Sequence, residues 1–132
     1  SKHSIVSGFK CVTKKDWINL GSSGKSEDVL PYYMDNFYKK MQKNNIKLCV
    51  LAVNTNLTRE KFRKLKEYKN IQLKYLPESI SNLMSIFVYG NNVVIFPIMS
   101  VIESFPIAIK IKNKESADSY REYFNWLWEL CK

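Results

Sequence analysis

The sequence predicts an α/β domain in which a mixed β-sheet is flanked by helices, because apolar segments of strand length alternate with segments of helical period. In addition, Gly90-Asn91-Asn92 separates two short apolar segments in the manner of a β-hairpin, and a long amphipathic segment closes the chain. The 132 residues, 45% of them hydrophobic, are enough for one domain with a core. No linker or repeat divides the chain, so residues 1–132 are expected to form a single domain, in which only 1–15 predict no clear element.

The first half of the chain predicts a strand, a helix and a second strand. The strand is expected over 16–20 and the second one, apolar throughout, over 47–53. The helix is expected over 27–44, with Tyr32 facing outward and Asn44-Asn45 at its end. Its inward positions follow a helical period: Leu30, Tyr33, Met34, Phe37 and Met41.

The middle of the chain predicts a short helix over 59–68, capped by Thr58, with Phe62 and Leu65 facing inward. A third strand is expected over 71–76, because apolar and polar residues alternate there.

The remainder predicts a hairpin of strands 84–89 and 93–96, a strand over 106–112 and a helix over 114–131 that Asn113 caps. Outward-facing Trp126, together with Tyr32, is a candidate dimer contact. The inward stripe of this last helix is Ala117, Tyr120, Phe124, Leu127, Trp128 and Cys131.

The chain is basic, with a formal net charge of +9, yet only Arg59, Arg63 and Arg121 are arginines. Proteins that read duplex DNA prefer arginine for guanine contacts. The charge is typical of a lysine-rich proteome, of a nucleic-acid surface, or of a surface that attracts anionic ligands. One specific alternative is a basic nucleic-acid-binding module, whose contacts would come from Arg59, Lys61, Arg63, Lys64 and Lys66.

No apolar run approaches the ~18 residues that span a bilayer, and the first residues lack the apolar core of a signal peptide. The expected location is therefore the cytoplasm, without a membrane partner. Cys11, Cys49 and Cys131 are odd in number and form no CxxC pair, which predicts thiols in a reducing cytosol rather than a zinc site.

The segment Leu20-Gly21-Ser22-Ser23-Gly24-Lys25-Ser26 is the strongest binding signal, because it joins a strand to the start of a helix. Such a turn presents backbone N–H groups and hydroxyls to an anion or a polyhydroxylated ligand. It departs from a phosphate-binding P-loop, since Asn19 stands where that pattern needs a glycine. A purely structural turn is the alternative. The predicted ligand-binding residues are Ser22, Ser23, Gly24, Lys25 and Ser26, with Asn54 at the end of the next strand.

Catalytic equipment is sparse. His3 is the only histidine, the cysteines have no candidate base, and most acidic residues stand alone. We therefore predict no catalytic residue, no metal site and no cofactor.

Three blocks resemble the effector-binding domain of TrmB-like archaeal transcription regulators: LGSSGKSEDVLPYYMDNFYKKMQKNNIKLCVL, IQLKYLPESISNLMSIFVYGNNVVIF and PIAIKIKNKESADSYREYFNWLWELCK. The resemblance covers about residues 15–132. It implies a phospholipase-D-like α/β sandwich without the catalytic activity of that fold. The reason is that Asn82, Met84 and Tyr89 stand at the His, Lys and Asp positions of its HxKxxxxD motif.

The same resemblance implies a sensor that binds a small-molecule effector, a sugar in the characterised members, and that acts as a homodimer. DNA binding in such regulators belongs to a winged helix-turn-helix that this sequence does not contain. DNA would therefore be reached only through a separate part.

Overall fold

The computed structural model describes residues 11, 14–24, 27, 31–80, 84–96 and 108–131. It is an α/β domain with a six-stranded mixed sheet, as the sequence predicts. Along the chain the elements are β1 (Trp17–Ser22), α3 (Pro31–Lys43), β2 (Leu48–Ala52), α4 (Asn56–Lys61), the 3-10 helix η1 (Arg63–Glu67), β3 (Ile71–Tyr75), β4 (Ser85–Tyr89), β5 (Asn92–Phe96), β6 (Ile109–Lys112) and α5 (Lys114–Leu130).

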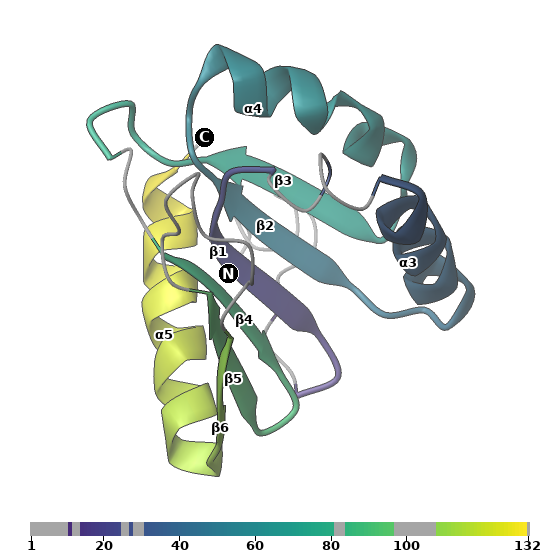
Figure 1. Ribbon diagram of the computed structural model, residues 1–132. Coiled ribbons are helices and arrows are strands. Elements are labelled where there is room, and N and C mark those ends of the chain that lie inside the picture. Colours follow the sequence, from purple (N-terminus) through teal and green to yellow (C-terminus); the bar gives the residue numbers. More distant parts are fainter. Residues whose placement is uncertain are drawn as a thin grey trace, which may run out of the picture.

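The strand order across the sheet is β3-β2-β1-β4-β5-β6 (Figure 1). Strands β1, β2 and β3 are parallel to one another, whereas β4, β5 and β6 each run antiparallel to the strand before them in the sheet. Because the three parallel strands end at the same edge, the loops that follow β1 and β2 lie next to each other there. We call this edge the carboxyl edge of the sheet.

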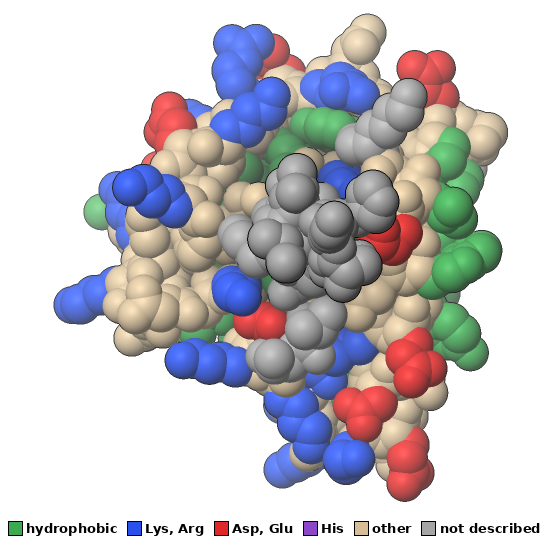
Figure 2. Space-filling model, turned by 180° about the vertical axis from the view of Figure 1, so that it is seen from behind, with side chains coloured by type: hydrophobic (Ala, Val, Ile, Leu, Met, Phe, Trp, Pro, Cys, Tyr) green, Lys and Arg blue, Asp and Glu red, His purple; other side chains and the backbone are tan. Residues whose placement is uncertain are grey.

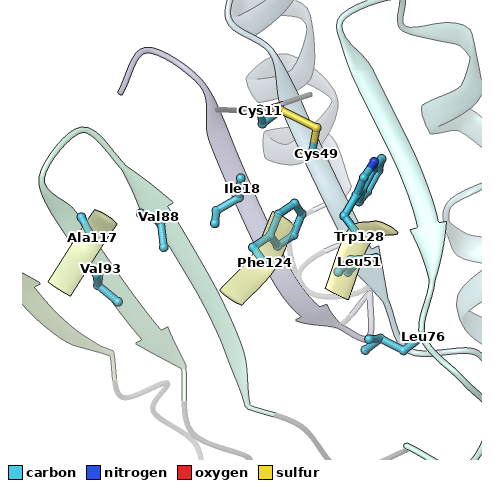
Figure 3. Packing of buried hydrophobic residues seen from close by; sticks show 10 residues of the cluster. All are labelled: Cys11, Ile18, Cys49, Leu51, Leu76, Val88, Val93, Ala117, Phe124 and Trp128. Atoms are coloured by element: carbon cyan, nitrogen blue, oxygen red, sulfur yellow. A yellow bond between two sulfur atoms is a disulfide. The ribbon is translucent and has the colours of Figure 1, made fainter. Parts of the chain in front are cut away.

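Helices cover both faces of the sheet. On one face α5 packs over β1, β4 and β5, and its buried Phe124 and Trp128 meet Ile18, Leu51 and Val88 (Figure 3). On the other face α3, α4 and η1 cover the parallel strands (Figure 1). Strand β2 is buried on both faces, which explains its unbroken apolar sequence.

Helix α3 buries Met34 and Met41, as predicted, and Phe37 is partly buried against the same core. The prediction is wrong for Tyr33, which is 61% exposed, because Tyr38 is the buried tyrosine of this helix. Burial of a tyrosine requires a partner for its hydroxyl, and that of Tyr38 donates a hydrogen bond to Glu27. Burial and this carboxylate raise the pKa of Tyr38 well above its usual value. Of the predicted inward stripe, Leu30 lies outside the described residues.

The predicted short helix is in fact two elements. Thr55, not Thr58, caps α4, since its Oγ1 accepts a hydrogen bond from the backbone N–H of Thr58 at 3.1 Å. Phe62 and Leu65 are buried, as predicted. The change to a 3-10 turn after Lys61 brings Leu65 onto the sheet within a short connection.

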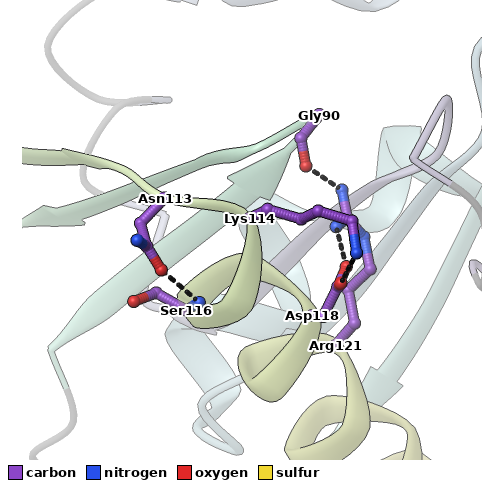
Figure 4. A network of polar contacts seen from close by, with 6 residues as sticks. All are labelled: Gly90, Asn113, Lys114, Ser116, Asp118 and Arg121. Atoms are coloured by element: carbon purple, nitrogen blue, oxygen red, sulfur yellow. Dashed lines mark hydrogen bonds and ion pairs between the residues drawn. The ribbon is translucent and has the colours of Figure 1, made fainter.

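The last helix agrees with its prediction. Asn113 accepts a hydrogen bond from the backbone N–H of Ser116 at 2.8 Å and so caps α5. From the helix, buried Arg121 donates to the carbonyl of Gly90 at 2.7 Å, and Asp118 lies 3.6 Å from its Nη1 (Figure 4). The arginine thereby fastens the β4–β5 turn to α5.

The prediction of three thiols is wrong for two of them. Cys11 and Cys49 form a disulfide, with their Cα atoms 6.1 Å apart, and both are buried in the core that α5 covers (Figure 3). Cys131 is the free cysteine of the described chain. The pairing requires Cys11 to lie next to Cys49 of β2, which spacing in the sequence does not reveal.

Among the residues that the structure describes, no helix has the length and apolar character needed to cross a membrane.

Candidate functional site

The loop that leaves β1 bends toward β2 at the carboxyl edge. Strand β1 ends at Ser22, two residues beyond its predicted end. Near that end Gly21 has a positive φ of 83°, and the register with β2 shifts between Leu20 and Ser22. The carbonyl of Ser22 then accepts a hydrogen bond from the backbone N–H of Val53 at 2.9 Å. A residue with a side chain rarely adopts this φ, which explains the glycine at this position.

The same loop lies against α4. The hydroxyl of Thr58 is 3.5 Å from the carbonyl of Ser23. Gly24, with a φ of 80°, lies so close to α4 that a Cβ atom there would be 2.8 Å from Cδ of Lys61. The positive φ favours glycine at this position, and a larger residue would also have to displace the flexible Lys61 chain.

The guanidinium group of Arg59 lies at the ends of β2 and β3, on the same helix that the loop contacts. Arg59 of α4 donates from Nε to Oδ1 of Asn54, at the end of β2, over 2.9 Å. Its guanidinium carbon also lies 4.1 Å from the centre of the Tyr75 ring, at the end of β3. Although Arg59 is exposed, these two contacts hold its guanidinium in one place.

We call this surface the carboxyl rim. It consists of Ser22, Ser23, Gly24, Asn54, Arg59, Lys61 and Tyr75. Burial raises the pKa of Tyr75, and the charge of Arg59 opposes that rise. The rim thus offers two cationic groups, two serine hydroxyls and a phenol to a ligand. This chemistry suits hydroxyl and anionic groups.

The structure brings Ser22, Ser23, Gly24 and Asn54 to one edge, as their predicted common role requires. Lys25 and Ser26 lie outside the described residues. Sequence reasoning missed Tyr75 and assigned Arg59 and Lys61 to a different surface. In the sequence, Arg59 stands only five residues after Asn54. The contact between the two side chains became visible only in the fold, where α4 brings Arg59 back to Asn54.

The basic residues of the nucleic-acid alternative lie on two consecutive elements, α4 and η1. Arg59 and Lys61 lie at the carboxyl rim, whereas Arg63 pairs with Glu60. Lys64 and Lys66 are exposed on η1. Figure 2 shows, from behind, that Lys and Arg side chains predominate on the side of α3, and that acidic and hydrophobic side chains lie along the side of α5.

The positions that replace the phospholipase D motif do not converge. Met84 lies at the start of β4 and is exposed, whereas Tyr89 lies at its end and stacks on Trp17, with ring centres 4.5 Å apart. Asn82 lies outside the described residues. Within the described parts of the chain, no group of three His, Cys, Asp or Glu residues is arranged to hold a metal ion.

Comparison with known proteins gives one informative likeness. No family model and no curated protein matches the chain. Among solved structures, the chain is similar to TrmBL2, an archaeal chromatin protein described as showing a novel mode of DNA binding. The TM-score is 0.60 at 16% identity, over 89% of this chain and 44% of that one. The likeness therefore shows a common fold, and this chain spans less than half of the neighbour's length.

Proposed function

We propose that the chain is a non-catalytic regulatory domain of the TrmB-like kind that binds a small molecule at the carboxyl rim. The observation that carries the proposal is the guanidinium of Arg59, which contacts Asn54 and Tyr75 at the edge of the sheet where β1, β2 and β3 end. A cationic side chain that already has contacts in the free protein loses little conformational entropy when a ligand binds. The carboxyl ends of strands are also the usual ligand-binding edge of α/β sheets.

The ligand class that best matches the rim is a sugar or a sugar phosphate. Serine hydroxyls and an amide suit a polyhydroxylated compound, and Arg59 with Lys61 suits an anionic group on it. The phospholipase-D-like sandwich and the TrmB-like relation stay part of this proposal. The shared fold with TrmBL2 supports them at the level of architecture.

A second copy of the chain is the proposed partner in regulation. Tyr123, Trp126 and Leu130 of α5 are each more than 60% exposed and recur at helical spacings of three and four residues. A ligand would then act by favouring one of two arrangements of such a dimer. Sedimentation of the chain and of Trp126→Glu tests this, since the variant is expected to be monomeric.

The test of the binding proposal is thermal stability against a panel of sugars and sugar phosphates. A ligand at about 100 times its dissociation constant adds about 2.7 kcal/mol, which shifts the melting temperature by several degrees. Arg59→Gln should abolish the shift. Arg63→Gln should retain it, because it removes the same charge from a residue that lies away from the rim and pairs with Glu60.

Duplex DNA at two salt concentrations completes the panel. A stabilisation by DNA alone that vanishes at high salt would favour the basic-module alternative, because phosphate contacts are strongly salt-dependent. No shift with any sugar or sugar phosphate, or an equal shift in both arginine variants, would contradict the rim as the binding site.

A further inference from the structure

We propose a second ligand site, distinct from the carboxyl rim, that binds a nucleotide by stacking its base. The site is a groove of about 440 Å³ between α3 and the beginning of β1 and β2. It lies at the opposite edge of the sheet, since Trp17 begins β1 and the rim starts at the other end of that strand, roughly 17 Å away. The lining residues are Trp17, Tyr33, Asn36, Phe37, Lys40, Met41, Asn44 and Ile46.

Two aromatic rings of α3, those of Tyr33 and Phe37, line the groove. Burial of Met34, Tyr38 and Met41 places Tyr33 and Phe37 at the margin of the core. Their rings are nearly parallel, with 12° between the planes and 6.4 Å between the centres.

Trp17 also lines the groove, and two other rings contact it. It stacks on Tyr89 at 4.5 Å and leans against Phe37 at 5.7 Å between ring centres. The aromatic surface is thus assembled without a ligand, which lowers the cost of binding a flat ring.

The polar lining favours a nucleotide over other flat or ringed ligands. Asn36 carries an amide, a group that both donates to and accepts from the edges of bases. The amide of Asn44 donates to the carbonyl of Lys40 at 2.9 Å, and its oxygen is an acceptor. Lys40 supplies a cation for a phosphate, and none of the eight lining residues is acidic. Lys39 and Lys43 are exposed on the same helix and add positive charge. The one acidic residue of α3 is Asp35.

The size agrees with one nucleotide unit. A volume of about 440 Å³ lies in the range of roughly 300–1,000 Å³ in which small ligands bind. Stacking on aromatic side chains tolerates any base, so the geometry assigns the chemical class, a base joined to a phosphate, and not its identity. The source is either a free nucleotide or one unit of a single strand.

Calorimetric titration of the whole chain with adenosine 5′-monophosphate, ribose 5-phosphate and an oligo(dA) strand tests the site. The monophosphate is expected to bind and ribose 5-phosphate to bind at least tenfold more weakly. Tighter binding of the oligonucleotide than of the monophosphate would support a single strand as the source. Binding of the monophosphate alone would support a free nucleotide.

Matched variants decide whether the groove is the site. Tyr33→Ala should weaken binding about fivefold or more, the range measured for loss of one stacked base. Tyr123→Ala is the control, because that ring has nearly the same exposure, 63% against 61%, but lies on α5. Arg59→Gln should leave nucleotide binding unchanged, which separates this site from the carboxyl rim.

The proposal would be overturned by any of three results. These are the absence of saturable binding of both nucleotide ligands, binding of ribose 5-phosphate equal to that of the monophosphate, and equal affinities in Tyr33→Ala and Tyr123→Ala.

Discussion

Replacement of Gly24 by alanine tests the packing of the β1 loop on α4, on which the carboxyl rim depends. Two costs are expected. A left-handed backbone costs an alanine about 1–2 kcal/mol relative to its preferred conformation. In addition, the new Cβ atom would lie 2.8 Å from Cδ of Lys61. That lysine chain is flexible, so moving it costs about 0.5–1.5 kcal/mol, the cost of a displaced rotamer.

Gly90 is the matched control for the backbone term. Its φ is 56°, and a Cβ atom there would meet nothing closer than 3.8 Å. Gly90→Ala is therefore expected to cost only the backbone term. The difference between the two variants, about 1 kcal/mol, measures the contact with Lys61. Urea denaturation resolves such a difference when the slope of the transition is unchanged.

A double-mutant cycle with Lys61→Ala completes the experiment. In that background, the free energy lost by Gly24→Ala should fall to the value for Gly90→Ala, since the contact is gone. An equal loss in both backgrounds would refute the close approach of the loop to α4.

Three further changes have defined outcomes. Tyr38→Phe should flatten the loss of stability above pH 10. Because the pKa of Tyr38 is raised in the folded chain, the unfolded chain loses this proton at a lower pH. The free energy of unfolding therefore falls by up to about 1.4 kcal/mol per pH unit, and urea titrations between pH 9 and 11 measure this fall. Reduction of the Cys11–Cys49 disulfide should cost about 4 kcal/mol on a chain-entropy basis for their separation of 38 residues, and a stability unchanged by reductant would refute the pairing. Asn113→Ala should cost about 0.5–2 kcal/mol by removing the cap bond to Ser116, which thermal unfolding would detect.

The sequence was most informative where one local rule acts alone. The cap at Asn113 and the turn at Gly90 were predicted at the residues where they occur, because capping and turn formation depend on neighbouring residues. Within α3 the prediction is wrong for one residue, since Tyr38 and not Tyr33 is the buried tyrosine. Both Tyr33 and Tyr38 follow an apolar spacing, and only the contact with Glu27 makes the second one the buried ring.

The candidate sites were predictable only in part. Ser22, Ser23, Gly24 and Asn54 follow strands, so their common edge follows from a parallel sheet. The addition of Arg59 and Tyr75 depends on α4 lying beside β3, which no pattern in the sequence encodes. The pairing of Cys11 with Cys49 likewise depends on a contact between residues 38 positions apart.

The most direct test of the account is a two-dimensional NMR titration of the labelled chain with sugars and sugar phosphates. The account predicts amide shifts confined to residues 22–24 and 54–61, with Tyr75, for at least one compound. Shifts centred on Lys64 and Lys66 on addition of DNA, with none at the carboxyl rim for any sugar or sugar phosphate, would contradict it.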